Sequence, residues 1–546
     1  MSTSLASEPI RPPALAPVAP SPPAPPPPAP AAPAAAPDSV SGRTWIAILS
    51  AVLGVFMAIL DIQVTNASLR DILGTLSATQ EEGSWVSTAY LAAEITAIPL
   101  TAYFTRVFTI RTFMLANMMA FLVFSTLCGM AWNLPSMIIF RMMQGFTGGA
   151  LIPTAMTLIL MRLPLSKRAG GLALLMLATT LAPTAGPALG GWLTDAYGWP
   201  SIFYINWVPG VLMLIGIAYG LDREKSNLAL LWDADWPAIV AMMTGLVALI
   251  VALEEGNRLD WFESNTIRML SGAALTGIVA WIALSLRSAK PFVNLRLFGR
   301  RNFNVASAVA ATTGMGLYGS TFLLPLFLAQ IAGYNSAQIG AVIMWMGLPQ
   351  IIVMPIASKL AQRFDNRIIC SIGLLLFATS CFLNSGMGAD TGRDQLIVSQ
   401  VFRAMGQPLV ILTLSNFATN GVAMADLSSA SSLFNMTRNL GGAIGTALLA
   451  TLLTMRQQFH WSRIGESVSA FAPATQERLA QLSAAFAGQS GDAAAAATQA
   501  MSAINRVMHR EAYVMAYNDC FFLMGVILLL SIGGVWIADR TIAGRR

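Results

Sequence analysis

Long apolar blocks, each able to cross a bilayer as a helix, follow one another along most of the chain. Their apolar residues are nearly continuous and are not spaced as on an amphipathic helix or strand. A bilayer core about 30 Å thick needs ~20 apolar residues per helix, because every backbone group must be paired there. The pattern predicts an all-α integral membrane protein of about fourteen transmembrane helices. The blocks are 44–66, 84–104, 111–131, 135–161, 168–193, 199–221, 235–253, 265–286, 303–330, 337–358, 366–386, 396–419, 431–455 and 513–537.

The composition indicates that lipid covers most of the protein surface. Of the 546 residues, 55% are hydrophobic and only 11% are charged, and the mean hydropathy is +0.63. A soluble domain carries roughly 25% charged residues. A surface so poor in charge would not be well hydrated, so we expect a multi-pass protein whose first partner is the lipid bilayer.

Basic residues in the loops predict the orientation in the membrane. They crowd the loops on one side, whereas the short loops on the other side hold only Arg70, Arg258, Arg268 and Arg393. Lys and Arg are enriched in cytoplasmic loops, so we expect both termini in the cytoplasm. The net charge of +6 is then explained by topology, and nucleic-acid binding is not expected.

Three segments lie outside the predicted membrane helices. Residues 1–43 hold 14 of the 29 prolines and predict a disordered, Pro/Ala-rich cytoplasmic tail that is not a cleaved signal peptide. Residues 541–546 form a second short cytoplasmic tail. The long loop 456–512 lies on the outer, periplasmic side, with helical spacing at 475–487 and 493–512. It is either a helical hairpin or a flexible connector.

A faint internal repeat divides the chain into two halves. In each half, a helix with Arg and Gln precedes a Gly-rich helix, and duplicated halves are typical of secondary transporters. The repeat predicts a six-helix bundle at 44–221, two linking helices within 222–302 and a second six-helix bundle at 303–540. The matching segments are Arg141-Met142-Met143-Gln144-Gly145 with Arg403-Ala404-Met405-Gly406-Gln407, and Gly186-Pro187-Ala188-Leu189-Gly190-Gly191 with Gly441-Gly442-Ala443-Ile444-Gly445.

Charged side chains inside the predicted helices are the candidates for chemistry. An intramembrane charge costs roughly 2.5–3.5 kcal/mol, so Asp61 and Glu94 are either proton carriers or partners in structural hydrogen bonds. Arg141 and Gln144 share one helix face, and a proton-dependent change in the pairing of Arg141 would couple protons to movement. The intramembrane cations of the second half, which are either conformational or structural, are Arg403 and Arg438.

The fifth predicted helix has features of a conformational element. Ala182, Gly186 and Gly190 are spaced by four and form a smooth face for close helix contact. Pro187 within this face removes a backbone donor and predicts a bend. Gly191 extends the Gly-rich segment.

The residues present exclude several other sources of activity. The chain has no GxxxxGK[ST] phosphate loop, its four cysteines occur singly, and its two histidines lie in one outer loop. We therefore expect no enzyme activity, no metal site and no cofactor, with a proton gradient as the energy source. The residues concerned are Cys128, Cys370, Cys381, Cys520, His460 and His509.

The motifs together resemble the major facilitator superfamily, and within it the fourteen-helix drug:H+ antiporters similar to EmrB. The similarity covers roughly 44–540, and the combination of motifs in this order is specific. Besides the Arg141 and Gly186 motifs, it rests on Leu60-Asp61-Ile62-Gln63-Val64-Thr65-Asn66-Ala67, on Trp199-Pro200-Ser201-Ile202-Phe203-Tyr204-Ile205-Asn206, on Arg301-Asn302-Phe303 and on Asn435-Met436-Thr437-Arg438.

The chain departs from the family pattern in the loop after the second helix. The acid–base motif is reduced there to Arg106, with Arg111 further on and no acid. The equivalent loop after the tenth helix keeps both signs of charge, in Asp365 and Arg367. An acid–base latch is therefore expected only in the second half.

The resemblance implies a function and partners. It implies the superfamily fold, with two six-helix bundles and two linking helices, and export of small hydrophobic or amphipathic drugs against proton entry. It also implies a bacterial inner-membrane location and a tripartite system with an EmrA-like periplasmic adaptor, of the membrane-fusion type, and an outer-membrane channel.

Two other functions remain open from the sequence. The nearer one is an exporter of one metabolite, such as a siderophore or a fatty acid, because pocket residues cannot be assigned from sequence. The other is a membrane receptor or scaffold, which would tolerate neutralisation of Asp61 and Glu94.

Overall fold

A computed structural model describes residues 40–232, 235–288, 290–469, 471–490 and 493–540. Every regular element in these residues is a helix. The helices are α1 (Gly42–Ala67), α2 (Leu69–Thr75), α3 (Gln80–Phe108), α4 (Ile110–Gly129), α5 (Leu134–Gly149), α6 (Leu151–Arg162), α7 (Leu165–Tyr197), α8 (Ser201–Tyr204), α9 (Trp207–Gly220), α10 (Trp236–Gly256), α11 (Asn265–Arg287), α12 (Arg301–Gln330), α13 (Ser336–Gly347), α14 (Gln350–Arg363), α15 (Asn366–Asn384), α16 (Arg393–Thr419), α17 (Leu427–Ser467), α18 (Pro473–Ser490) and α19 (Ala493–Val535), with 3-10 turns η1 (Leu228–Leu231), η2 (Trp261–Glu263), η3 (Leu295–Gly299) and η4 (Met424–Asp426).

Each of the predicted apolar blocks lies on one helix or on two consecutive helices, such as α5 with α6 or α13 with α14. Within the described residues, ten helices are long and apolar enough to cross a membrane, or eleven if a bent pair in α7 is one span. Helix α3 is not among these ten, and it carries several buried polar side chains, such as Thr96 and Thr101. The multi-pass, all-helical architecture is confirmed, and the count of fourteen stays a prediction.

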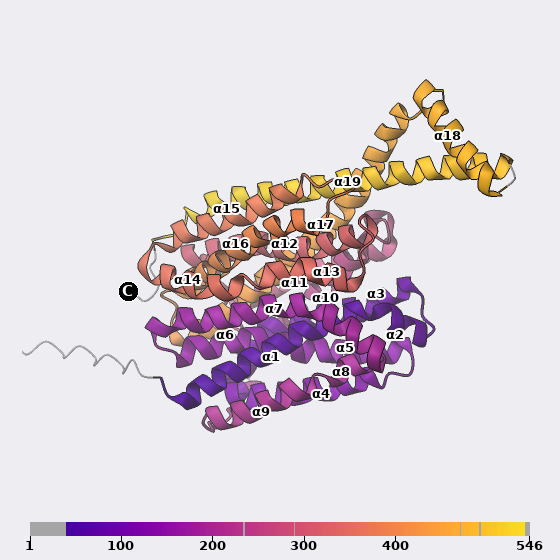
Figure 1. Cartoon of the computed structure of the whole chain (residues 1–546). Coiled ribbons are helices and arrows are strands. Elements are labelled where there is room, and N and C mark those ends of the chain that lie inside the picture. Colours follow the sequence, from indigo (N-terminus) through magenta and orange to yellow (C-terminus); the bar gives the residue numbers. More distant parts are fainter. Residues whose placement is uncertain (1–39, 233–234, 289, 470, 491–492, 541–546) are drawn as a thin grey trace, which may run out of the picture. The chain divides into compact units, whose positions relative to one another are not determined.

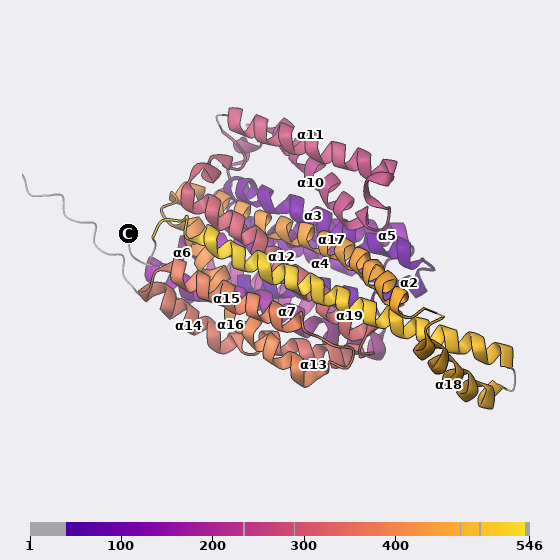
Figure 2. The ribbon, with the colours of Figure 1, turned by 90° about the horizontal axis from the view of Figure 1, so that it is seen from above.

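The helices form two groups, joined by a pair (Figure 1). In the first group, α1 packs on α7 and α9, while α3 and α4 pack on α5. In the second group, α12 packs on α17 and α19, while α15 packs on α16 and α19. Helices α10 and α11 pack on each other, and α10 also contacts α3 and α17, as Figure 2 shows from above.

The two groups meet along two seams. Helices α3 and α6 pack on α17, and α7 packs on α13 and α14. Hydroxyl groups close one end of the first seam. Thr101 is hydrogen-bonded to Ser432 at 2.6 Å, and Thr105 is hydrogen-bonded to Ser428 at 3.0 Å. Because these bonds join different groups, this end must open if the groups separate there.

The helices predicted within residues 456–512 are present. Helix α18 packs on α19, and both views show it beside the first part of that helix (Figures 1 and 2). At the base of the pair, Asp519 on α19 accepts a 2.5 Å hydrogen bond from Arg456 on α17 and lies 2.7 Å from His460 Nε2. These contacts join the two long helices from which the hairpin extends.

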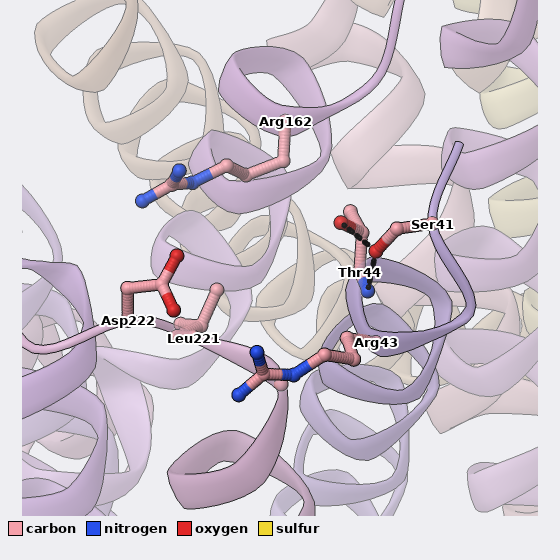
Figure 3. A pocket seen from close by; sticks show the side chains of 7 residues that line it. Ser41, Arg43, Thr44, Arg162, Leu221 and Asp222 are labelled. Atoms are coloured by element: carbon pink, nitrogen blue, oxygen red, sulfur yellow. Dashed lines mark hydrogen bonds between the residues drawn. The ribbon is translucent and has the colours of Figure 1, made fainter. Parts of the chain in front are cut away.

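The predicted tails lie mostly outside the described residues, which begin at Val40 and end at residue 540. Helix α1 begins at Gly42, so the last two residues of the predicted first tail are helical. The Ser41 hydroxyl accepts a hydrogen bond from the Thr44 backbone at 3.3 Å and caps the helix (Figure 3). Such a cap satisfies one of the free amides at a helix start.

Candidate functional site

A buried ion pair joins two of the predicted site residues. Arg141, on α5, donates a 2.7 Å hydrogen bond to the Asp61 carboxylate on α1. Gln144 donates to the same carboxylate at 3.0 Å and accepts from Arg141 at 2.7 Å. Asp61 and Arg141 are 2% and 1% exposed, so the pair is enclosed by protein. The sequence predicts Asp61 on one helix, and Arg141 and Gln144 on one face of another helix. The structure brings these three side chains together.

Two further residues complete this network and were not predicted as site residues. Asn206, just before α9, donates to Asp61 at 2.6 Å and to the Ser125 hydroxyl at 3.0 Å. The Tyr90 ring lies under the Arg141 guanidinium, 4.3 Å from its centre, in a cation–π contact. Asn206 ends the Trp199 motif that carries the family resemblance, so the motif was its only sequence signal.

Glycines of α5 explain why Arg141 sits so close to α3. A Cβ at Gly145 would collide with the Tyr90 backbone oxygen, and one at Gly149 would lie 2.6 Å from the Glu94 backbone oxygen. Glycines spaced by four allow such close backbone approach between helices. The contact brings the Tyr90 ring beside Arg141.

Helix α7 packs on α1 through the predicted small-residue face. A Cβ at Gly186 would collide with the Gln63 side chain, and one at Gly190 would lie 2.9 Å from the Val64 oxygen. Gly191 has open space where a Cβ would point, so close packing does not require it. The predicted bend measures 44° and falls between Pro183 and Ala185, where the Pro187 ring would meet the carbonyl four residues earlier.

Glu94 lies outside the Asp61 network. It is 9% exposed on α3, a helix that packs on α5 of its own group and on α17 of the other group. Arg438, on α17, is 4% exposed. Glu94 and Arg438 are therefore buried charged side chains on two helices that meet at the seam.

Arg403, the second predicted intramembrane cation of the second half, is hydrogen-bonded to a neighbouring helix. Arg403, on α16 and 2% exposed, donates to the Leu317 oxygen at 3.1 Å and to the Thr321 hydroxyl at 2.9 Å. Both acceptors belong to α12, so Arg403 connects two helices of one group. Any part it plays in gating stays a prediction.

The two loops compared in the sequence form different contacts. Asp365 forms a 3.0 Å ion pair with Arg367, and its carboxylate lies 3.6 Å from the Arg540 guanidinium. Arg106, which has no acid in its own loop, donates to the Phe292 oxygen at 2.5 Å instead. Burial lowers the pKa of the Arg106 guanidinium, and the charge of Asp426 opposes that change. The Phe292 backbone carbonyl, in the segment after α11, therefore takes the place of the missing acid.

A small pocket of about 110 Å³ lies apart from these residues, where α1 begins and α6 and α9 end (Figure 3). Arg162 at its rim forms a 2.8 Å ion pair with Glu224. None of the predicted site residues lines it. Its lining residues are Ser41, Arg43, Thr44, Arg162, Gly220, Leu221 and Asp222.

Metal binding has no support in the described part of the chain, where no group of three or more His, Cys, Asp or Glu could hold an ion. The site itself offers a buried carboxylate, a guanidinium and amides, which can bind protons and charged or polar groups.

Comparison with known proteins places this chain in a family. The Major Facilitator Superfamily profile matches residues 51–446. The colistin resistance protein EmrB of Acinetobacter baumannii is 33% identical over 89% of this chain and 94% of its own. The fatty acid resistance protein FarB of Neisseria gonorrhoeae is 30% identical over 90% and 96%, and the multidrug export protein EmrB of Escherichia coli K12 is 31% identical over 90% and 95%.

The fold is similar to that of a solved transporter. The human organic anion transporter MFSD10 superposes with a TM-score of 0.61 at 12% identity, over 91% of this chain and 100% of that one. At this identity the likeness concerns the fold alone. With a matching profile over most of its length and bacterial relatives over nearly all of it, the chain belongs to the Major Facilitator Superfamily and is a multi-pass membrane transporter similar to the EmrB exporters.

Proposed function

We propose that this transporter is a proton-coupled antiporter that exports hydrophobic and amphipathic drugs across a bacterial inner membrane. The observation that carries the proposal is the buried Asp61–Arg141 ion pair at 2.7 Å. Protonation of Asp61 would remove the counter-charge of Arg141, and an unpaired buried cation is strongly unfavourable. The helices α1 and α5 would then adopt a different arrangement, so a proton gradient would drive movement without a cofactor.

The relatives support the direction and the substrates of transport. One name describes resistance to colistin and another describes export of multiple drugs, and export is outward transport. The hairpin of α18 and the first part of α19 supports a tripartite system, because it offers a surface for a periplasmic adaptor of the EmrA-like membrane-fusion type. In this proposal the adaptor connects the transporter to an outer-membrane channel.

The test uses purified protein in liposomes with an imposed pH gradient. We expect hydrophobic drugs to evoke proton movement in the wild type, and we expect Asp61→Asn to abolish it. Glu94→Gln is measured beside it as the second predicted proton carrier. Proton movement that is unchanged in both variants would remove the coupling role of these carboxylates.

The second candidate function is export of one metabolite. It is favoured by the similarity to FarB, whose name describes resistance to fatty acids. A panel of drugs and a panel of fatty acids in the same liposomes separate the two. Proton movement with fatty acids but with none of the drugs would support the narrow exporter, and binding without any proton movement would support a receptor or scaffold.

A further inference from the structure

Within the described residues, only hydrogen-bond donors bind the Asp61 carboxylate. Arg141 donates to its Oδ2 atom at 2.7 Å, while Gln144 and Asn206 donate to its Oδ1 atom at 3.0 and 2.6 Å. Asp61 is 2% exposed and Asn206 is 1% exposed, so protein encloses both side chains. An ionised carboxylate only accepts hydrogen bonds, so this arrangement fits the ionised form. A protonated Asp61 would need an acceptor for its O–H group.

The Ser125 hydroxyl determines which way the Asn206 amide points. Ser125, on α4, donates its one proton to the Phe203 backbone oxygen at 2.8 Å, so it can only accept from Asn206. The Nδ2 atom of Asn206 must therefore lie toward both Ser125 and Asp61. The Oδ1 atom of the same amide is enclosed and has no hydrogen-bond partner among the described residues. Asn206 thus carries an unused acceptor beside the carboxylate that would need one.

The Gln144 amide is less able to supply this acceptor. Its Oε1 atom already accepts from Arg141 at 2.7 Å and from the Cys128 thiol at 3.5 Å. Turning the amide would place its N–H groups against the Arg141 guanidinium, which is itself only a donor. Asn206 can turn without losing a bond to its Oδ1 atom, because that atom has none.

The local structure also leaves the Asn206 side chain available. Asn206 directly precedes α9, a position where an asparagine side chain commonly accepts from the first amides of a helix. Its side chain forms no such cap, and Gly210 binds only its backbone oxygen, at 3.0 Å. The amide is directed instead at Asp61 on α1, 145 positions away.

We propose that Asn206 is a positioning residue that accommodates both protonation states of Asp61 by turning its amide. The inference rests on the proposed proton coupling and adds a residue to it. When Asp61 takes up a proton at Oδ1, the Asn206 Oδ1 atom turns toward it and accepts the new O–H group. The Ser125 hydroxyl then turns from the Phe203 oxygen to the same amide oxygen. The proton is thus held between α1 and the start of α9, and its arrival releases a backbone oxygen of α8.

The charged and titratable groups around Asp61 are the same with and without the Asn206 amide. Helices α6 to α9 carry their ionisable side chains at or near their ends. An uncharged replacement of Asn206 alters none of these groups, so it tests the hydrogen bonds. The groups that face the network are Arg141 from α5, Cys128 from α4, and Tyr90 and Glu94 from α3.

The test observes the Asp61 carboxyl group directly. Infrared difference spectra of the full chain in liposomes, titrated from high to low pH without drug, record the C=O stretching bands of protonated carboxyl groups. The band that is absent in Asp61→Asn belongs to Asp61. Drug-evoked proton movement is measured separately on the same preparations.

The variants remove one hydrogen-bonding group at a time. Asn206→Leu has a similar size but neither donor nor acceptor, and Ser125→Ala removes the hydroxyl that orients the amide. Both are also combined in a double variant. Asn384→Leu is the control, because Asn384 on α15 is 3% exposed, has a side-chain oxygen without a partner in the described chain, and lies in the other group of helices.

We expect Asn206→Leu to move the midpoint of the Asp61 band to higher pH by about one unit, because a hydrogen bond to a charged group is stronger than one to a neutral group. The frequency of the band should also change, since the O–H group has lost its acceptor. Ser125→Ala should cause a smaller shift to higher pH, because Ser125 forms two hydrogen bonds in the ionised state and one in the protonated state. It should add nothing in the Asn206→Leu background, and Asn384→Leu should change neither quantity.

An Asp61 band with the same midpoint and frequency in the wild type and Asn206→Leu would overturn the proposal. A Ser125→Ala shift that persists in the double variant would also overturn it. If Asn206→Leu does not fold, Ser125→Ala decides by itself, and an unchanged band there overturns the proposal. Absence of an Asp61 band at every pH would overturn both this role and proton binding by Asp61.

Drug-evoked proton movement separates these results from failure of the export function. If drugs evoke proton movement in the wild type but the Asp61 band is independent of Asn206, only the positioning role is overturned. If the band depends on Asn206 but no compound evokes proton movement in the wild type, the positioning role stands and the export function fails.

Discussion

The Asp61–Arg141 pair makes the free energy of unfolding depend on both partners. Asp61→Asn leaves Arg141 as an unpaired buried cation, and breaking a buried pair in this way costs about 3–5 kcal/mol. We expect a clearly lower Tm in detergent for Asp61→Asn. The double variant Asp61→Asn/Arg141→Gln should recover most of that Tm, because it removes the unpaired charge.

The same variants separate stability from transport. Both should lack drug-evoked proton movement, since neither keeps the titratable carboxylate. A double variant that regained transport would contradict a proton-carrying role for Asp61. If Asp61→Asn alone had the wild-type Tm, the Asp61–Arg141 ion pair would not be formed in the detergent-solubilised protein.

Close packing between α1 and α7 can be tested with two adjacent glycines. A Cβ at Gly190 would lie 2.9 Å from the Val64 oxygen, a backbone atom, whereas Gly191 has open space. We expect Gly190→Ala to lower both the Tm and transport. Gly191→Ala should be neutral or should raise stability by about 0.5–1 kcal/mol, since alanine favours the helix.

Equal behaviour of the two alanine variants would contradict the packing of α7 on α1 that the structure shows. The comparison is controlled internally, because both changes add one methyl group to the same helix.

The hairpin formed by α18 and the first part of α19 is a second element that can be tested alone. Helix α18 packs on α19, so replacing Pro473–Ser490 with a short Gly/Ser linker should preserve the membrane helices. We expect drug-evoked proton movement in liposomes to remain within about twofold of the wild type, because Asp61 and Glu94 are untouched. Drug resistance conferred on cells that contain the adaptor should be lost.

Loss of proton movement in liposomes would instead assign the hairpin to the transport cycle. Unchanged resistance in cells would contradict adaptor docking on α18.

Movement of the two helix groups can be tested at the closed end of their seam. Thr105 and Ser428 are hydrogen-bonded at 3.0 Å across α3 and α17. With both replaced by cysteine in a background without the native cysteines, an oxidant or a short thiol cross-linker should join them. We expect transport to stop and to return on reduction, because alternating access requires this end to open.

A matched pair within one group is the control. Thr312 and Ser531 are hydrogen-bonded at 2.8 Å between α12 and α19, which belong to the same group. Cross-linking cysteines at these positions should leave transport unchanged. Arrest by both pairs, or by neither, would contradict rigid movement of the two groups. Mass spectrometry measures the extent of each cross-link.

Much of the fold could be predicted because its signals are local in the chain. A bilayer requires a continuous apolar run in each spanning helix, so hydropathy located most of the long helices. The same argument singled out Asp61, Glu94 and Arg141, since each interrupts an apolar run. The bend near Pro187 also followed locally, from a missing backbone donor.

The sequence by itself therefore determined the membrane class, the helices, the internal repeat and the buried charges. Only the tertiary structure decided which charges meet. Asp61 pairs with Arg141, 80 positions away, and is joined by Asn206, whereas Glu94 is buried outside this network. It also showed that Gly190 is tightly packed while Gly191 is not. The physical reason is that hydropathy depends on each segment alone, whereas pairing depends on how separate helices pack, through side-chain shape and close backbone contact.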